Sequence, residues 1–315
     1  MTNFYGQFIG FGAGGAVAGY AFGGSAYGYH SGSANPATAG VSDGIGKYSF
    51  TSDGDSVDTA NLSVGRGDCG GSQSATHGYI AAGGNQSSGY NTYGNVIDKH
   101  QYATTDDATD VGNLTVKRHT VSCTTSLEHG YAHAGHYGPR SNIIERWAFA
   151  SDGDASDVGN LTIARNTCGY ASKETHGYCM GGYDSSYSNI VDIYAFVSSG
   201  DASDVGNLTV ARQSDGGASS STHGYCCAGS SGSAENVIDR WSFADGGDCS
   251  DVGDLDNGAY GRNASSSTTH GYVAQGWTTS INTWIDKFSF ATGTEAGSEI
   301  ADAFESGSGG GAHHI

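Results

Sequence analysis

Hydrophobic positions in this chain occur in short runs, and none of the runs follows the spacing of a helix. Segments such as Tyr79-Ile80-Ala81-Ala82 and Val96-Ile97 have the length of a strand and are bounded by Gly, Ser, Asn and Asp. Short apolar segments between turn residues, without a 3.6-residue period, predict an all-β protein.

The same sequence motif recurs along the chain at a nearly constant interval. His-Gly-Tyr stands at 77–79, 129–131, 176–178, 223–225 and 270–272, so successive histidines lie 52, 47, 47 and 47 residues apart. A fixed period in this range is typical of solenoids, propellers and other repeat arrays.

Each repeat contains four segments of strand length. A run of small polar residues leads into His-Gly-Tyr and Y-x-A-G-G, a variable loop follows, and then come N-x-I-D-x-x-x-F, an acidic loop and V-G-N-L-T-V-A-R. Four short antiparallel strands in a repeat of about 47 residues predict one blade of a β-propeller.

The repeat resembles the kelch repeat, over residues 10 to about 304. The resemblance rests on the double glycines at 23–24, 83–84 and 181–182, the following V/I-D/E-x-x-F/Y and a strand that ends near Arg. The chain departs from that family by Val-Gly in place of the usual tryptophan and by the added His-Gly. The wording of the repeats is similar to that of marine bacteriophage virion proteins. The resemblance implies a six-bladed kelch-like β-propeller.

The first and last repeats are incomplete. Gly19-Tyr20-Ala21-Phe22-Gly23-Gly24 aligns as a decayed first copy of Y-x-A-G-G, followed by a long insertion. The chain contains six strands of the Y-x-A-G-G type but only five clear V-G-N-L-T strands. Asp302 stands where the leucine of the sixth copy is expected. We therefore expect one propeller over 1–305. Residues 2–9, within a possible closing strand at 1–9, or alternatively Ile300–Phe304, would supply the last outer strand. The Gly/Ser-rich segment 306–315 is predicted to be a flexible tail or to dock on a neighbour.

The charge of −19 excludes the phosphate backbone of a nucleic acid as an expected partner, because phosphate contacts need a basic surface. It also disfavours anionic membranes, and no apolar run approaches the length of a membrane span. The first residues lack a basic n-region, so we expect no Sec export, with release by assembly or lysis. The seven cysteines form no CxxC pair and are interpreted as small buried residues.

One arginine and one acid recur in every full repeat, which predicts a structural ion pair within or between blades. The ten residues are Arg66, Arg118, Arg165, Arg212 and Arg262 with Asp98, Glu145, Asp192, Asp239 and Asp286.

Two repeated features could hold a metal ion. The His-Gly histidines could form a ring for a cation or a pH switch, but we favour a tight turn with the imidazoles hydrogen-bonded to a neighbouring blade. The acidic loops are rich in carboxylates, which calcium prefers, and Asp152, Asp154 and Asp157 are the weak candidates. Asx turns account for the same residues, so no cofactor is predicted and calcium stays an alternative.

The loops after the double glycine do not repeat, and aromatic residues occupy them. We expect a binding surface at their tips, because exposed Tyr and Trp are enriched at recognition sites. The candidates are Tyr27, Tyr29, Tyr90, Tyr93, Tyr137, Tyr183, Tyr187 and Trp277.

These observations favour a non-enzymatic structural and binding module. We expect an exposed component of a phage virion (a fibre, tail appendage or capsid decoration) that recognises another virion protein or a cell-surface glycan. No G-x-S-x-G or H-E-x-x-H motif supports an enzyme. A carbohydrate-active propeller enzyme and a cytoplasmic kelch-type scaffold remain the alternatives, and a homo-oligomer is left open.

Overall fold

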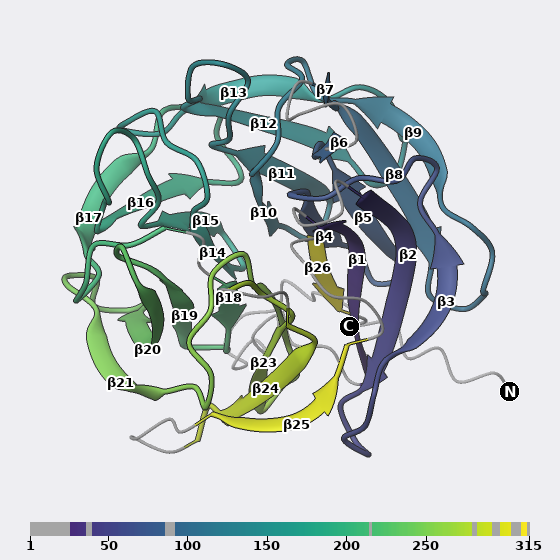
Figure 1. Ribbon diagram of the computed structural model, residues 1–315. Helices are drawn as coiled ribbons and strands as arrows, with labels where there is room; N and C mark the ends of the chain where they lie inside the picture. Colours follow the sequence, from purple (N-terminus) through teal and green to yellow (C-terminus); the bar gives the residue numbers. More distant parts are fainter. Residues whose placement is uncertain are drawn as a thin grey trace, which may run out of the picture.

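The computed structural model describes residues 26–35, 40–85, 92–213, 216–278, 282–291, 297–303 and 310–313. Within these residues the chain forms six antiparallel sheets of four strands, arranged around a central axis (Figure 1), and no helix. None of the described residues therefore belongs to a helix that could span a membrane. The predicted all-β, six-bladed propeller is confirmed.

The strands are numbered in chain order, and each blade is given from the axis outward. Blade 1 is β26 (Gly310–His313), β1 (Tyr27–Asn35), β2 (Gly40–Ser49) and β3 (Val57–Asn61); blade 2 is β4 (Gly70–Gln73), β5 (His77–Ala81), β8 (Val96–Gln101) and β9 (Thr109–Asn113); blade 3 is β10 (Ser122–Thr125), β11 (His129–His133), β12 (Ile143–Ala148) and β13 (Ser156–Asn160). Blade 4 is β14 (Gly169–Lys173), β15 (His176–Met180), β16 (Ile190–Ala195) and β17 (Ser203–Asn207); blade 5 is β18 (Gly216–Ser219), β19 (His223–Ser230), β20 (Ala234–Ser242) and β21 (Ser250–Asp254); blade 6 is β22 (Asn263–Ser266), β23 (His270–Ala274), β24 (Trp284–Ser289) and β25 (Ser298–Asp302). A small hairpin of β6 (Gly84–Asn85) and β7 (Thr92–Tyr93) extends the β5–β8 loop of blade 2.

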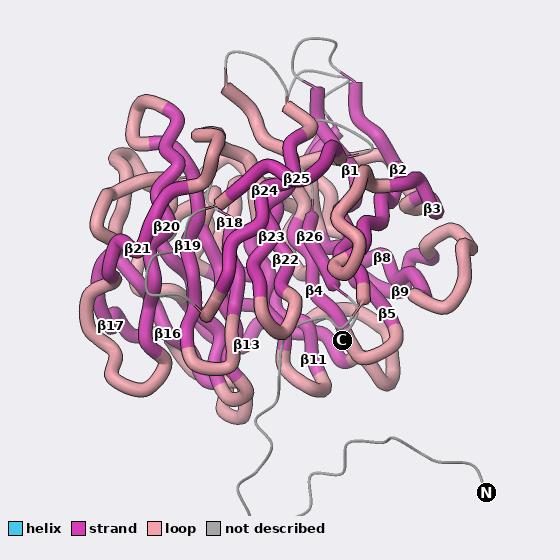
Figure 2. Tube along the Cα trace, turned by 90° about the horizontal axis from the view of Figure 1, so that it is seen from below, coloured by secondary structure: helices cyan, strands magenta, loops and turns pink. Residues whose placement is uncertain are grey.

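Because neighbouring strands are antiparallel, successive loops lie at opposite ends of the blades (Figure 2). The His-Gly turns between the first and second strands lie at one end, which we call the turn face. The variable loops between the second and third strands lie at the other end, which we call the loop face. The connections from each blade to the next also run along the loop face.

Blade 1 closes the ring in a way that corrects the sequence prediction. Its innermost strand is β26, whose Gly310–His313 pair with Ser31–Gly28 of β1. The segment predicted to be a tail thus supplies an inner strand. The glycines of this segment have the composition of a linker. However, some positions of the inner strands have room only for small residues. A Cβ at Gly217 of β18, for example, would lie 1.8 Å from the carbonyl oxygen of Tyr170.

The outer strand of blade 6 comes from its own repeat. β25 pairs with β24, with Trp284 opposite Asp302, as the alternative closure by Ile300–Phe304 anticipated. Asp302 occupies the position of Asn160 in blade 3, so the buried residue that replaces the missing leucine is Ala303. The other predicted closing strand, residues 2–9, lies outside the described residues.

The register of the first repeat also differs from the prediction. Tyr27 pairs with Ser49 as His77 pairs with Gln101, so Gly28-Tyr29 is the first copy of Gly-Tyr, and Tyr27 replaces the histidine. The segment interpreted as a long loop is therefore mostly the hairpin of β1 and β2. Tyr20 was aligned with this position because it also follows a glycine. It lies outside the described residues.

The Gly-Tyr pair explains how the blades pack. Most of these glycines lie under an aromatic ring of the next strand: a Cβ at Gly271 would lie 2.2 Å from the Phe288 ring, whereas Gly224 lies against Ala171 and Phe243. Each tyrosine stacks on an aromatic ring of the following blade, and the stack of Tyr272 on Phe50 joins blade 6 to blade 1 at 4.5 Å. The equivalent stacks are Tyr29–Tyr102, Tyr79–Phe149, Tyr131–Phe196, Tyr178–Phe243 and Tyr225–Phe290.

Candidate functional site

The repeated arginines and acids meet inside the blades. Each arginine stands before the innermost strand of a blade and contacts the carboxylate on the third strand of that blade. The nitrogen–oxygen distances are 2.9 Å for Arg66–Asp98, 2.6 Å for Arg118–Glu145, 2.9 Å for Arg165–Asp192, 2.8 Å for Arg212–Asp239 and 2.6 Å for Arg262–Asp286. All ten side chains are buried, so these charges hold the blades together and are closed to a ligand.

A Ser or Thr hydroxyl completes most of these pairs, from the connection that follows the outer strand of the preceding blade. Asp192 accepts hydrogen bonds from the backbone amide and the hydroxyl of Thr162, at 3.1 and 2.7 Å, besides the one from Arg165. Blade 6 departs from this pattern, because the residue after Leu255 is Asp256. Burial raises the pKa of the Asp286 carboxyl, Arg262 opposes that shift, and the nearby Asp256 adds to it.

The acidic loops bind to the preceding blade at the rim of the propeller. Asp154 accepts hydrogen bonds from the backbone amide and the side-chain amide of Asn113, at 2.9 and 3.3 Å, and the amide of Ala155 donates to the Asn113 carbonyl. The same pattern joins Asn61 to Asp107, Asn160 to Asp201 and Asn207 to Asp248. The loops thus cover the exposed edge of each outer strand, which would otherwise be open to pairing with another chain.

The three calcium candidates have separate partners. Asp152 pairs with Lys99 of blade 2 at 3.0 Å, Asp154 binds Asn113, and Asp157 accepts from the amide of Gly159 at 3.1 Å. Across the described ranges, no group of three or more His, Cys, Asp or Glu residues is placed to hold a metal ion. Asp152 and Asp154 thus contact the preceding blade, whereas Asp157 is bound within its own strand.

The His-Gly histidines are also bound locally, but within their own turn and not to a neighbouring blade as expected. The Nδ1 atom of His77 lies 2.8 Å from the hydroxyl of Thr76, and His176, His223 and His270 have the same threonine partner. In blade 3 the residue before His129 is Glu128, so the threonine partner is replaced there. Partial burial lowers the pKa of all five imidazoles.

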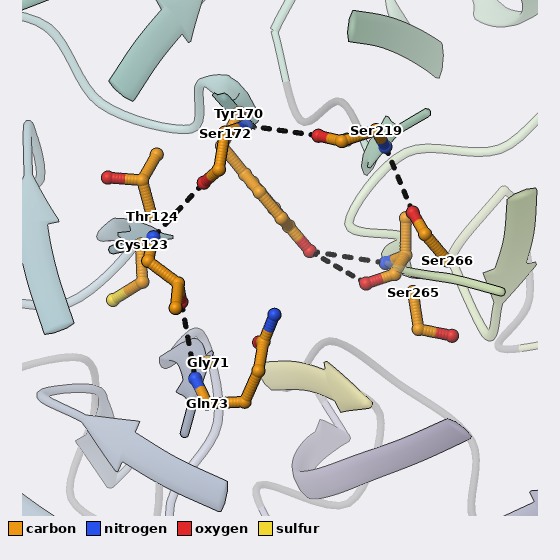
Figure 3. A pocket seen from close by; sticks show the side chains of 12 residues that line it. Gly71, Gln73, Cys123, Thr124, Tyr170, Ser172, Ser219, Ser265 and Ser266 are labelled. Atoms are coloured by element: carbon orange, nitrogen blue, oxygen red, sulfur yellow. Dashed lines mark hydrogen bonds between the residues drawn. The ribbon is translucent and has the colours of Figure 1, made fainter. Parts of the chain in front are cut away.

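Small hydroxyl residues surround the central axis (Figure 3). The amide of Gln73 donates to Thr125, the amide of Thr125 to Ser172, that of Ser172 to Ser219, and that of Ser219 to Ser266, over 2.9–3.2 Å. These bonds join five successive blades at their innermost strands.

One unrepeated residue, Tyr170, crosses the axis. Its hydroxyl donates to the carbonyl of Ala264 in blade 6 at 3.0 Å and accepts from the Ala264 amide at 3.3 Å (Figure 3). The equivalent positions are Gly71, Cys123, Gly217 and Ala264, which leave room for the ring. The remaining cavity measures about 30 Å³, enough for little more than a water molecule. Among the described residues, the cavity on the axis therefore has no room for a larger ligand.

The loop face carries the residues that differ from blade to blade. In five blades a residue near the repeated Arg forms an isolated β-bridge with a residue at the end of the second strand or just after it; we call these the mouth pairs. They are Gly67–Gly84, His119–His136, Asn166–Tyr183, Gln213–Ser230 and Tyr260–Trp277. Each pair has the same backbone pairing, so only the side chains change.

Most of the aromatic candidates gather at these pairs. Tyr183 contacts Tyr187 edge to face at 5.5 Å, and the Arg140 guanidinium lies 4.7 Å from the centre of the Tyr183 ring. Trp277 contacts Tyr260 at 5.0 Å. Tyr93 and Tyr137 also lie on the loop face; Tyr93 stacks on His119 at 5.1 Å, and Tyr137 is exposed.

Three of the predicted binding residues need a different account. Tyr29 is buried at 3% exposure in the Gly-Tyr position, so it belongs to the core. Tyr27 starts β1, with the ammonium of Lys47 3.9 Å from its ring centre, and is therefore a strand residue instead of a loop tip. Tyr90 lies outside the described residues.

Sequence reasoning missed four residues of the loop face: His119, His136, Arg140 and Tyr260. Two of them, His119 and His136, stand directly after the repeated Arg and after the second-strand glycine, at positions that vary in every repeat. A comparison of the repeats at those two positions would have found them.

No profile of a known protein family matches this sequence, and no curated protein matches it. Among solved structures, the chain is similar to one titled "Structure of YjhT", with a TM-score of 0.68 and 10% sequence identity over 81% of this chain and 91% of that one. At this identity the likeness concerns the fold alone.

Proposed function

We propose that this chain is a non-enzymatic binding module that recognises a protein partner or a glycan through its loop face. The observation that carries the proposal is the contrast between repeated and unrepeated residues. The repeated arginines and acids have partners within the propeller, and four of the five repeated histidines have one in their own turn. The unrepeated Tyr183, Tyr187, Tyr260 and Trp277 lie half-buried around the mouth pairs.

Half-buried aromatic rings suit both kinds of partner. Their faces stack on sugar rings or on apolar side chains, while neighbouring packing limits the rotamer entropy that binding would cost. Arg140, next to Tyr183, adds the donors of a guanidinium and would favour a partner with carboxylate or sulfate groups.

We further propose that the module is an exposed component of a phage virion. The support is the kelch-like wording of the repeats, with Gly181-Gly182, Val191-Asp192 and the strand that ends at Arg212, together with the acidic composition. The alternative is a cytoplasmic kelch-type scaffold.

Binding is tested with the purified full chain on an array of glycans and on candidate virion proteins. We expect the variant Trp277→Ser to lower affinity at least tenfold, while the matched variant Val197→Ser, at a residue 88% exposed and away from the mouth pairs, keeps it. Equal loss in both variants, or no loss in Trp277→Ser, would count against the loop face. Release of sugar from a bound glycan would favour the enzyme alternative.

The location is tested by mass spectrometry of purified particles produced from the source of the gene. We expect peptides of this chain at a constant ratio to the major capsid protein. Their absence from particles, with the chain found in the host cytoplasm, would favour the scaffold.

A further inference from the structure

The mouth pair of blade 3 brings two imidazoles together on the loop face. The backbone amide of His119 donates to the carbonyl of His136 at 3.0 Å, and the His136 amide donates back at 2.9 Å. This pairing places the side chains next to each other, with Nε2 of His119 3.3 Å from Nδ1 of His136.

That separation matches two ligands of one metal ion. Zinc–nitrogen bonds of 2.0–2.1 Å at a tetrahedral angle place the two nitrogens about 3.3–3.4 Å apart. One imidazole N–H donates to the other ring, so the donor ring must move that proton to its other nitrogen before both facing nitrogens can bind an ion. Both residues are partly exposed, which leaves the ion open to solvent.

Two neighbours, Asp68 and Tyr93, contact the rings. An Asp68 carboxylate oxygen lies 3.5 Å from Nδ1 of His119, on the side away from His136. Carboxylates in this position orient histidine ligands and raise their basicity. Tyr93 stacks on His119 with an angle of 12° between the planes and contacts His136 edge to face at 6.1 Å.

We propose that His119 and His136 form a site for a borderline divalent transition-metal ion such as Zn²⁺. The protein supplies two imidazole nitrogens, and water or a donor atom from a bound partner fills the other positions. The net charge of −19 raises the local concentration of cations. The guanidinium of Arg140 lies over the Tyr183 ring, 4.7 Å from its centre.

The first test is calorimetric titration of the full chain, without an affinity tag, with Zn²⁺ at pH 7.5. We expect one equivalent to bind, His119→Ala and His136→Ala each to weaken binding at least tenfold, and Asp68→Asn to weaken it about tenfold. Two controls should keep the affinity: His129→Ala, which removes a turn-face histidine, and the double variant His313→Ala/His314→Ala, which removes the two adjacent histidines near the end of the sequence.

The second test is long-range ¹H–¹⁵N spectroscopy of the imidazoles. Addition of Zn²⁺ should shift Nε2 of His119 and Nδ1 of His136, with the remaining histidine nitrogens unchanged. No binding by the unmodified chain, or binding that survives in either alanine variant, overturns the proposal. Neither test requires knowledge of what the loop face recognises, so failure here leaves the proposed binding function intact.

Discussion

The bodies of the blades and the mouth pairs use the same kinds of side chain for opposite purposes. In the blade bodies, histidine, aspartate and arginine recur at fixed positions, and each contacts a partner that recurs with it, as Arg165 contacts Asp192. At the mouth pairs the backbone recurs and the side chains do not. A histidine such as His176 is bound to Thr175 in its own turn, whereas His119 faces a second histidine that no other blade has.

The difference shows how to interpret an ionisable residue in a repeat protein. A residue that returns in every repeat, with its partner, contributes to folding. A residue that appears in one repeat only, at a position where the backbone is the same in all repeats, can change without loss of the fold. Such a residue is a candidate for ligand binding.

The largest expected effect lies in the blade bodies. Arg165→Met should lower the free energy of unfolding by about 3–5 kcal/mol, because Asp192 would remain buried without its partner. Urea denaturation measures the loss, and Lys117→Met, at an exposed lysine, is the control. A loss below about 1 kcal/mol would mean that the buried pairs do not hold the blades.

His100, on the third strand of blade 2, differs from the residues at the equivalent position of the other blades. His100 covers Gly78 where other blades have Trp147 or Phe288, and within the described structure neither of its ring nitrogens has a hydrogen-bond partner. Burial lowers its pKa from 6.5 to about 4. The unfolded chain therefore binds a proton first as the pH falls below 6.5, and the folded state loses stability down to about pH 4.

His100→Phe should remove that acid sensitivity. Between pH 7.5 and pH 5 the unmodified chain should lose about 2 kcal/mol more than the variant, from about 1.5 pH units at 1.36 kcal/mol each. Urea denaturation at the two pH values measures the difference. His30, which burial also shifts to a pKa of about 4, stays in both proteins and leaves a common residual effect. Identical pH profiles would show that the His100 environment is more polar than its contacts indicate.

A smaller effect is expected at the rim. Asp154→Ala removes the acceptor of two hydrogen bonds from Asn113 and should cost about 0.5–1.5 kcal/mol. Thermal unfolding with and without Ca²⁺ separates packing from metal binding: the midpoint of the unmodified chain should not respond to the ion. A rise with Ca²⁺ that Asp154→Ala abolishes would restore the calcium alternative.

The smallest effect on stability should lie at the mouth pairs. Tyr183→Ser removes a ring that contacts Tyr187 and Arg140 near the surface, and should change the free energy of unfolding by no more than about 0.5–1 kcal/mol. The same variant should lose binding to the partner found for the loop face. A loss of several kcal/mol would place Tyr183 among the structural residues and erase the contrast.

Much of the fold followed from the sequence because the repeat displays each strand several times. The regular copies gave the strand order, and the equal numbers of arginines and acids suggested the contacts between them. The ends were harder. Gly28-Tyr29 and Gly310–His313 have lost the repeated wording, and an inner strand of glycine and alanine has the composition of a linker.

The candidate site was predicted less well, for a physical reason. Whether a tyrosine is core or surface depends on the strand register, and a shift in the first repeat changed the assignment of Tyr27 and Tyr29. Tyr170 shares an inner-strand position with Gly71 and Gly217, and its path across the axis depends on the space that those small residues leave in other blades. No local pattern contains that information.

The pairing of β26 with β1 has a consequence for the order in which the protein can assemble on the ribosome. Blades 2 to 6 each consist of one continuous stretch of chain and can form as they emerge. Blade 1 must hold three strands ready while the rest is synthesised, with the inner edge of β1 unpaired until Gly310–His313 arrive. Until then the nascent ring has an open seam at β1, and an unpaired edge of this kind can pair with a strand from another chain.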